Sequence, residues 1–359
     1  MQTRCYFIPL SIDPEALMKA VILSEHGGPE VLRYTDVPEP AIGAREVLVR
    51  VRACALNHLD LWVRRGLAGR TIALPHIPGS DISGEVFTVG EGVTNVRPGD
   101  RVLLAPGLSC GQCEPCVAGR DSFCKEYTLF GAGVHGGYAE FVKSPDVNVI
   151  PIPGNLTFEE AAAVPLVFLT AWHMLFTRAQ LRPAEHVLVL AAGSGVGSAA
   201  IQIAKAAGAR VIATAGSEAK LAKARELGAD DTVLHAGEFA REVKRLTNGR
   251  GVDIVVEHVG QATWEQSIYS LTTGGRLVTC GATTGFDGKV NLGYLFARQL
   301  SILGSFMGSK AELYSALELF RRGLLKPVVD CVLPLERAAE AHKRLENREQ
   351  FGKVVLRVP

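Results

Sequence analysis

After about Thr157 the chain alternates short apolar strands with helices, and this alternation constrains the fold more than any other feature. The predicted strands are apolar and cover residues 186–192, 210–214, 231–234, 252–258, 276–280 and 300–304. Helices are predicted at residues 196–207, 217–227, 238–246, 263–271 and 310–322. Buried strands that alternate with helices form a parallel sheet through right-handed crossovers. The pattern therefore predicts an α/β, doubly wound nucleotide-binding domain.

A glycine-rich turn joins the first of these strands to the first helix, with the sequence Ala191-Ala192-Gly193-Ser194-Gly195-Val196-Gly197. Small residues at such a turn let the backbone approach a pyrophosphate, and the helix N-terminus supplies amides and a positive dipole end. The strict G-x-G-x-x-G spacing is absent, because Ala192 and Ser194 occupy the first two glycine places. A plain packing turn is the alternative. Its position in the alternating array favours dinucleotide binding.

The end of the second strand indicates which dinucleotide is bound. NAD-binding domains place an acidic residue about 20 residues after the turn, where it holds the ribose hydroxyls. Here that position falls on Ala215, so no carboxylate repels a 2′-phosphate. Ser217 and Lys220 can hydrogen-bond the phosphate, although Ser217 can instead simply cap the helix and Lys220 be solvated. Glu218 argues locally against phosphate, yet NADPH is favoured and NADH stays possible.

Four of the eight cysteines lie close together in the pattern Cys110-x2-Cys113-x2-Cys116-x7-Cys124, within a loop that contains Gly and Pro. Four thiolates so near one another can surround one Zn²⁺ tetrahedrally and leave no position open for substrate. The sequence therefore predicts one structural zinc, with a redox cluster as the alternative. The remaining cysteines are scattered singly, which is not the pattern of a secreted disulfide protein, and a cytoplasmic location is expected.

The segment from Met18 to about Val149 has short β-type runs broken by Gly and Pro and predicts a β-rich domain. Examples of these runs are residues 47–52, 84–89, 101–104 and 138–142. The first 17 residues lack the basic leader, apolar stretch and cleavage site of a signal peptide, and read as an N-terminal extension.

Composition excludes two classes of partner. With 38 Lys and Arg against 37 Asp and Glu, the chain has no basic block that would attract nucleic acid or an anionic membrane. No apolar run approaches the ~20 residues that a membrane-spanning helix needs. The expected partner is a small-molecule substrate.

Together these features resemble the medium-chain dehydrogenase/reductase superfamily over essentially the whole chain after Met18. Further matching motifs are Pro98–Val102 (PGDRV), Gly137–Glu140 (GYAE), Leu169–Trp172 (LTAW), Gly275–Val278 (GRLV) and Gly352–Val355 (GKVV). The chain looks most similar to relatives of the quinone oxidoreductases that carry a zinc lobe and are often named alcohol dehydrogenases. The resemblance implies four segments: an extension (1–17), a GroES-like catalytic domain (18–167, zinc lobe 107–127), a Rossmann domain (168–307) and a return to the catalytic domain (308–359).

The same resemblance implies the coenzyme contacts. Thr170 corresponds to a residue at the nicotinamide, Gly195, Val196 and Gly197 to the pyrophosphate turn, and Ser217 and Lys220 to the residues that read the phosphate. Cys280 to Ala282, including Gly281, correspond to the edge of the ring pocket, and Gly193, Val259 and Lys353 complete the predicted set. Phe306 and Met307 are expected to line the pocket or a subunit edge.

The chain departs from the zinc-dependent alcohol dehydrogenases at their metal ligands. Their ligand cysteine stands three residues before an aspartate that matches Asp60, and Asn57 occupies that position here. Their Gly-His-Glu motif appears as Gly79-Ser80-Asp81, and the third ligand position falls near Leu166. We therefore expect no catalytic zinc. A non-standard metal site built from Cys54, His58, His76 and Asp81 is the alternative.

Without a metal to polarise a simple ketone, an activated carbon–carbon double bond or a quinone is the easier hydride acceptor. We predict hydride transfer from NADPH to a quinone or an α,β-unsaturated carbonyl compound. Asn57 and Ser80 are candidates to hold the substrate oxygen or merely fill the vacated site, and His58 is a candidate proton donor or a structural histidine. The alternatives are a zinc-dependent alcohol or aldehyde dehydrogenase with unusual ligands, and a non-catalytic NADPH-binding scaffold or sensor.

A homodimer or homotetramer is expected as well. In this superfamily the last strands of the nucleotide-binding domain often pair across a dimer, and residues 300–304 correspond to such a strand.

Overall fold

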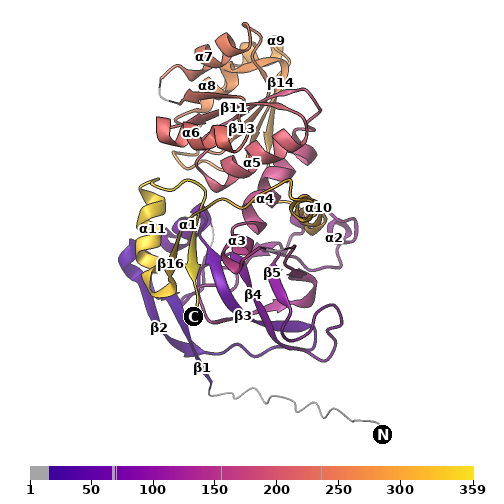
Figure 1. Ribbon diagram of the computed structural model, residues 1–359, viewed down its shortest axis with the longest axis vertical. Helices are drawn as coiled ribbons and strands as arrows, with labels where there is room; N and C mark the ends of the chain where they lie inside the picture. Colours follow the sequence, from indigo (N-terminus) through magenta and orange to yellow (C-terminus); the bar gives the residue numbers. More distant parts are fainter. Residues whose placement is uncertain (1–15, 67–68, 70, 155, 236) are drawn as a thin grey trace.

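The computed structural model describes residues 16–66, 69, 71–154, 156–235 and 237–359. The predicted extension lies outside them except for residues 16 and 17. The described chain forms two large sheets with helices packed around them, and the two bodies built on these sheets stack along the long axis of the molecule (Figure 1). None of the described helices has the length and apolar character needed to cross a membrane.

The nucleotide-type sheet is fully parallel, with strand order β12-β11-β10-β13-β14-β15. Its strands are β10 (His186–Val189), β11 (Arg210–Ala215), β12 (Asp231–Leu234), β13 (Val252–Glu257), β14 (Leu271–Thr279) and β15 (Ser301–Gly304). Its helices are α5 (Gly195–Ala206), α6 (Glu218–Glu226), α7 (Phe239–Leu246), α8 (Trp264–Tyr269) and α9 (Leu292–Ala297). The strand order reverses beside β10, so the carboxyl ends of β10 and β13 flank a crevice suited to a ligand.

The second sheet is mostly antiparallel and has the order β16-β17-β3-β4-β5-β9, with β8 also paired to β3. Its strands are β3 (Glu46–Ala55), β4 (Asp81–Val89), β5 (Arg101–Leu104), β8 (Phe141–Pro145), β9 (Val149–Pro151), β16 (Val329–Pro334) and β17 (Lys353–Arg357). Two smaller ladders pair β1 (Leu17–Leu23) with β2 (Leu32–Pro38), and β6 (Gly107–Leu108) with β7 (Thr128–Leu129). The helices of this part are α1 (His58–Arg65), α2 (Glu114–Val117), α3 (Phe158–Ala162) and α11 (Ala338–Glu346).

Two helices lie between the sheets in Figure 1: α4 (Pro165–Trp172), which continues as a π-helix over His173–Arg178, and α10 (Lys310–Arg321). After α10 the chain returns to the antiparallel sheet, where β17 pairs with β3. This pairing places the start of β17 beside the end of β3, so residues almost 300 positions apart in sequence share one site.

Two elements differ from the sequence-based prediction. The run predicted at 138–142 forms strand β8 only from Phe141. The backbone of the fully buried Tyr138 bonds instead to Val21 of strand β1 and to the loop residue Pro78. Helix α1 lies in the segment predicted to be β-rich. Its short apolar stripe, with Leu61 and Val63 buried, is too brief to stand out as a helical period.

Candidate active site and metal centre

One cavity of about 570 Å³ lies between the two bodies and is lined from both. The end of β3, helix α1 and β17 line one wall, while the turn after β10 and the ends of β11 and β13 line the other. Much of the wall is apolar, including Leu56, Trp62, Leu129, Leu166 and Val167. An apolar cleft with a few convergent polar groups is the usual form of a small-molecule site.

The glycine-rich turn forms the floor of this cavity at the N-terminus of α5. The Ser194 hydroxyl accepts a hydrogen bond from the Gly197 N–H at 2.8 Å and caps the helix. A Cβ on Gly195 would lie 2.7 Å from Val167 Cγ1 and 2.9 Å from Lys353 Cδ, so no side chain fits there. The turn therefore leaves a shallow cradle of backbone amides at a helix N-terminus, which suits an anionic pyrophosphate.

His258, at the end of β13, supplies an unpartnered polar atom to the same cavity. Its Nε2 lies 2.7 Å from Ser194 Oγ, and its buried Nδ1 has no hydrogen-bond partner among the described residues. Burial lowers the pKa of this imidazole, so the ring is neutral near pH 7. A neutral ring nitrogen left without a partner complements a ligand hydroxyl or phosphate oxygen, and the site thus fits a dinucleotide.

The far end of the cavity, where β11 ends, is lined by Ala215, Gly216 and Ser217 and by two cations, Lys220 and Arg348. Lys220 Nζ donates to the Arg348 carbonyl oxygen at 2.5 Å, which ties α6 to the segment after α11. Among the described residues no carboxylate, Glu218 included, lines this end of the cavity. The sequence did not single out Arg348, which reaches the site only through the tertiary fold.

A compact polar cluster surrounds Asn57, the position at which the resemblance places a ligand cysteine of the zinc-dependent alcohol dehydrogenases. Lys353 Nζ lies 2.5 Å from Asn57 Oδ1 and 2.8 Å from Asp81 Oδ2, and Asn57 Nδ2 donates to Asp81 Oδ2 at 2.9 Å. The Leu166 N–H donates to the other Asp81 oxygen at 2.7 Å. Asp81 is fully buried and the Lys353 side chain is only 4% exposed. Asn57 and Lys353 line the cavity, whereas Asp81 lies behind them.

The backbone around this cluster is held by Asp60. Its carboxylate accepts hydrogen bonds from the Asn57 N–H at 2.7 Å and the Gly79 N–H at 3.1 Å. Burial raises the pKa of this carboxyl to about 7. Gly79 has φ of +100°, and a Cβ there would lie 2.4 Å from Tyr138, so only glycine fits. Asp60 and Gly79 thus fix the segment that carries Asn57.

The other two candidate catalytic residues are placed differently. The Ser80 hydroxyl donates to the Phe130 carbonyl oxygen at 2.7 Å, and this buried residue does not line the cavity. His58 does line it, with its ring edge-to-face against Trp62 at 5.0 Å between centroids. Burial, followed by the charge of Arg65, lowers the pKa of His58 to about 4. A neutral imidazole of such low pKa is a poor proton donor near pH 7.

Thr170, Cys280, Phe306 and Met307 also line the cavity. Thr170 is buried on α4, and its hydroxyl lies 4.0 Å from Met307 Sδ. Burial raises the pKa of the Cys280 thiol to about 12, so the thiol is protonated near pH 7.

The cavity brings together most of the predicted site residues. Those that line it are Asn57, His58, Thr170, Gly193, Gly195, Val196, Ser217, Lys220, Val259, Gly281 and Lys353. Ser80, Gly197 and Ala282 do not. His235, His258 and Arg348 also line the cavity, although the sequence analysis did not select them. The signal that could have found the histidines is their position at the carboxyl ends of β12 and β13.

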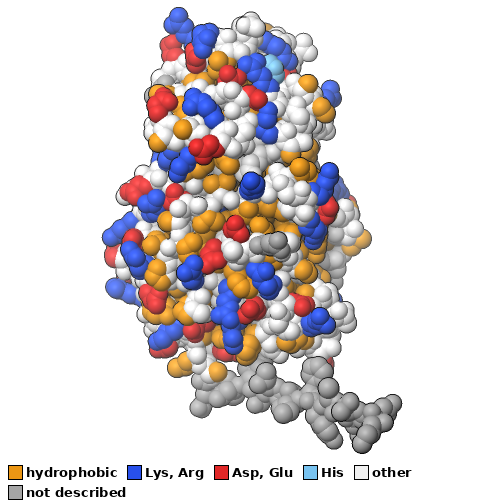
Figure 2. Space-filling model, in the orientation of Figure 1, with side chains coloured by type: hydrophobic (Ala, Val, Ile, Leu, Met, Phe, Trp, Pro, Cys, Tyr) orange, Lys and Arg blue, Asp and Glu red, His pale blue; other side chains and the backbone are white. Residues whose placement is uncertain are grey.

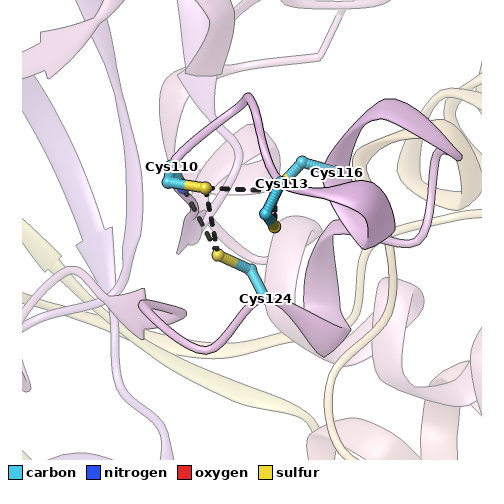
Figure 3. A group of neighbouring side chains, drawn as sticks. All are labelled: Cys110, Cys113, Cys116 and Cys124. Carbon is cyan, nitrogen blue, oxygen red and sulfur yellow. Dashed lines mark hydrogen bonds between the residues drawn. The ribbon is translucent and has the colours of Figure 1, made fainter.

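The four clustered cysteines converge at a separate point, at the base of a loop on the antiparallel body (Figure 3). The Sγ–Sγ distances are 3.9 Å for Cys110–Cys116, 3.4 Å for Cys113–Cys116 and 3.6 Å for Cys110–Cys124. A tetrahedron with Zn–S bonds of about 2.3 Å has edges of about 3.8 Å. Backbone N–H groups of Gln112 and Cys113 lower the pKa of Cys110 to about 7. These four residues fit a structural zinc.

No other such group occurs among the described residues. The cysteines are the one set of three or more His, Cys, Asp or Glu whose ligand atoms lie within 4.8 Å of one another, and Cys54, His58, His76 and Asp81 do not converge. Surface charges also follow no single sign, since blue and red side chains intermix on the face in Figure 2.

The parallel sheet, the anion-binding turn at a helix N-terminus and the apolar cleft facing it define a dinucleotide-dependent oxidoreductase. Comparison with known proteins gives the family. Residues 43–154 match the alcohol dehydrogenase GroES-like domain, and residues 195–322 match the zinc-binding dehydrogenase domain. The chain belongs to the medium-chain dehydrogenase/reductase superfamily, whose members include NAD(P)H-dependent quinone oxidoreductases and alcohol dehydrogenases.

Three similar proteins illustrate the range of this family. The quinone oxidoreductase of Rattus norvegicus is 33% identical over 351 residues, covering 95% of this chain and 98% of the relative. The acryloyl-coenzyme A reductase of Metallosphaera sedula is 32% identical over 340 residues, with 94% and 99% coverage. The crystal structure of an NAD-dependent alcohol dehydrogenase has a TM-score of 0.93 and 54% identity, and covers 95% of this chain and 100% of that one.

Proposed function

We propose that the protein reduces a quinone or an α,β-unsaturated carbonyl compound with NADPH and without a catalytic zinc. The observation that carries this proposal is the set of side chains at the three positions where the resemblance places zinc ligands. At the first of them an amide, Asn57, faces the cavity in place of a cysteine. Ser80 is turned to Phe130, and Leu166 presents an apolar side chain. An amide, a hidden hydroxyl and a leucine do not form a zinc site.

NADPH, when bound, supplies a hydride and is oxidised to NADP⁺. A substrate that accepts the hydride at the far carbon of its conjugated system moves an electron pair onto its carbonyl oxygen. A hydrogen-bond donor beside that oxygen stabilises the developing enolate, and Asn57 Nδ2 has one N–H that is not used in the cluster. Since His58 stays neutral, the proton that completes the reduction comes from water.

The preference for NADPH rests on the far end of the cavity. Lys220 and Arg348 line it, and Ala215 stands where NAD-binding domains place a carboxylate. Two cations beside the ribose position complement a 2′-phosphate, while the missing carboxylate removes the usual contact with a free 2′-hydroxyl.

The relatives support two substrate classes within the proposal. An acryloyl thioester, the substrate in the name of one relative, is an activated carbon–carbon double bond like an enone. A quinone, in the name of another, delocalises the added negative charge in the same way.

Steady-state assays with NADPH and three acceptors test this function: an enone, a naphthoquinone and acryloyl-CoA. We expect turnover with at least one, unaffected by brief treatment with a chelator. Two other outcomes contradict the proposal. Turnover restricted to alcohols or aldehydes, lost with a second zinc, favours an alcohol dehydrogenase, the activity in the name of the 54% identical structure. Tight NADPH binding without turnover of any acceptor favours a scaffold or sensor.

We also propose that the protein is located in the cytoplasm and that it forms a homo-oligomer. Strand β15 lies at the edge of the parallel sheet with one side unpaired among the described residues, and an exposed edge strand is a template for pairing with a second copy. Leu292 and Phe296 of the preceding helix α9 are 71% and 76% exposed, so an apolar patch lies nearby. Light scattering coupled to size exclusion measures the subunit number, and a monomer at micromolar concentration contradicts this part.

A further inference from the structure

Lys353 was expected among the coenzyme contacts, yet its ammonium is directed to the other side of the cavity. Its stem passes the pyrophosphate turn, since a Cβ on Gly195 would meet Lys353 Cδ at 2.9 Å. Its Nζ ends between Asn57 and Asp81, at 2.5 and 2.8 Å. The positive charge of this polar cluster therefore lies directly beside Asn57, the position at which the resemblance places a zinc-ligand cysteine.

The hydrogen bonds within the cluster use its acceptor atoms, so the groups that remain for a ligand are N–H donors. Lys353 has three N–H groups, of which the contacts with Asn57 and Asp81 use two. Asn57 uses Oδ1 as acceptor and one Nδ2 hydrogen as donor, which leaves a second N–H. Asp81, the carboxylate of the cluster, is fully buried and accepts hydrogen bonds from Lys353, Asn57 and the Leu166 N–H. One N–H from each of Asn57 and Lys353 remains, and both side chains line the cavity.

We propose that Lys353 is a catalytic residue that replaces the metal as electrophile: together with Asn57 it binds the carbonyl oxygen of the substrate and stabilises the enolate. Asp81 is the positioning residue. It fixes the ammonium and sets the amide of Asn57 with nitrogen toward the carboxylate and oxygen toward lysine, because the reverse orientation would face an N–H with the ammonium. This inference rests on the proposed function. There Asn57 alone stabilises the enolate, and here Lys353 joins it as a second, positively charged donor.

An ammonium held in a dry cleft favours a negatively charged ligand oxygen over a neutral one. The binding of 4-nitrophenol in the presence of NADP⁺ measures this preference without any turnover, because the phenolate and the phenol have different visible spectra. We expect the wild-type protein to bind the phenolate at a pH where free 4-nitrophenol is mostly protonated. The Lys353→Met variant should bind 4-nitrophenol mainly in its protonated, phenol form. The Lys353→Arg variant should again bind mainly the phenolate.

Lys353→Met leaves Asp81 buried without its partner and can fail to fold for that reason. The double variant Asp81→Asn/Lys353→Met removes both charges at once and keeps the chain neutral at this point. It should remain folded and lose the phenolate preference. Lys143→Met, at an exposed lysine on β8, is the matched control and should behave as wild type.

Kinetics separate a catalytic role from a coenzyme contact. For Lys353→Met or the double variant we expect kcat to fall by about 10²–10³-fold, as when an oxyanion donor is removed, with NADPH affinity changed less than about threefold. The proposal is overturned if the wild type does not bind the phenolate, if both charge-removing variants bind it as tightly as the wild type, or if the loss appears in NADPH affinity alone. A phenolate preference without turnover of any acceptor would instead refute the proposed function and leave the donor site standing.

Discussion

Asp121 of the cysteine lobe binds Lys310 at the start of helix α10. Its carboxylate accepts a hydrogen bond from the Lys310 backbone N–H at 3.0 Å and forms an ion pair with Lys310 Nζ at 2.8 Å. Helix α10 begins three residues after Met307, which lines the cavity together with Phe306. The lobe therefore supports one wall of the active site from outside, although its cysteines do not touch the cavity.

This contact leads to a prediction about zinc. We expect one zinc per subunit in protein purified without chelators, and loss of that zinc in Cys116→Ser together with a lower melting temperature. Because the lobe holds α10, substrate KM should rise as well. Cys331→Ser, at a cysteine outside the cluster, is the control and should keep its zinc. Elemental analysis and thermal unfolding measure both effects, and two zincs per subunit would contradict the prediction.

Coenzyme preference should depend on the cations at the far end of the cavity. Lys220→Ala and Arg348→Ala should each weaken NADPH by about tenfold or more, the effect of losing a charged phosphate contact worth about 1.4 kcal/mol, and leave NADH nearly unchanged. Lys223→Ala lies on the same helix, does not line the cavity and serves as the control. Fluorescence titration gives the dissociation constants. Equal losses for NADPH and NADH would refute the phosphate assignment.

The stability of the protein should decrease as the pH is lowered, because His342 is buried in its neutral form. This buried ring lies 3.2 Å from Arg64 Nη1 and 3.2 Å from the Tyr138 hydroxyl. Burial, and then the charge of Arg64, lowers its pKa to about 3, from 6.5 in the unfolded chain. The unfolded state therefore binds the proton first, so this contribution is complete above about pH 6.5 and is lost toward about pH 3, by at most about 1.4 kcal/mol per pH unit.

Urea unfolding between about pH 7.5 and about pH 5 measures this slope. His342→Gln should flatten it, while a residual slope remains because His58 shifts in the same direction. His26→Gln, at an exposed histidine, should leave the slope as in the wild type. An unchanged slope in His342→Gln would show that the ring is not kept neutral.

Gly79 should tolerate no side chain. Gly79→Ala combines a φ of +100° with contacts of 2.4 Å to Tyr138 and 2.7 Å to Cys54 Sγ. Gly99 has a similar φ of +91° but open space around it. We expect Gly99→Ala to cost about 1–2 kcal/mol and Gly79→Ala about 1–3 kcal/mol more, because overpacking adds to the backbone cost. Chemical denaturation measures both, and equal costs would mean that the neighbours yield.

The sequence by itself determined the parallel nucleotide-type sheet and the four-cysteine cluster. Both are local patterns: the strand–helix period of residues 186–304 follows from side chains a few positions apart, and the four cysteines converge because they share one short loop. The glycine-rich turn could also be predicted from a local pattern, since it joins a predicted strand to a predicted helix.

Only the tertiary structure decided how the site is assembled. Lys353 meets Asn57 and Asp81 because β17 pairs with β3 across the sheet, and Arg348 reaches the cavity because α11 ends beside it. Ser80 was a reasonable candidate by position, but the fold aims it at Phe130. Sequence periodicity reports which face of an element is buried. It carries no information on which distant residue meets that face, because such contacts depend on strand order and on packing between elements far apart in the chain.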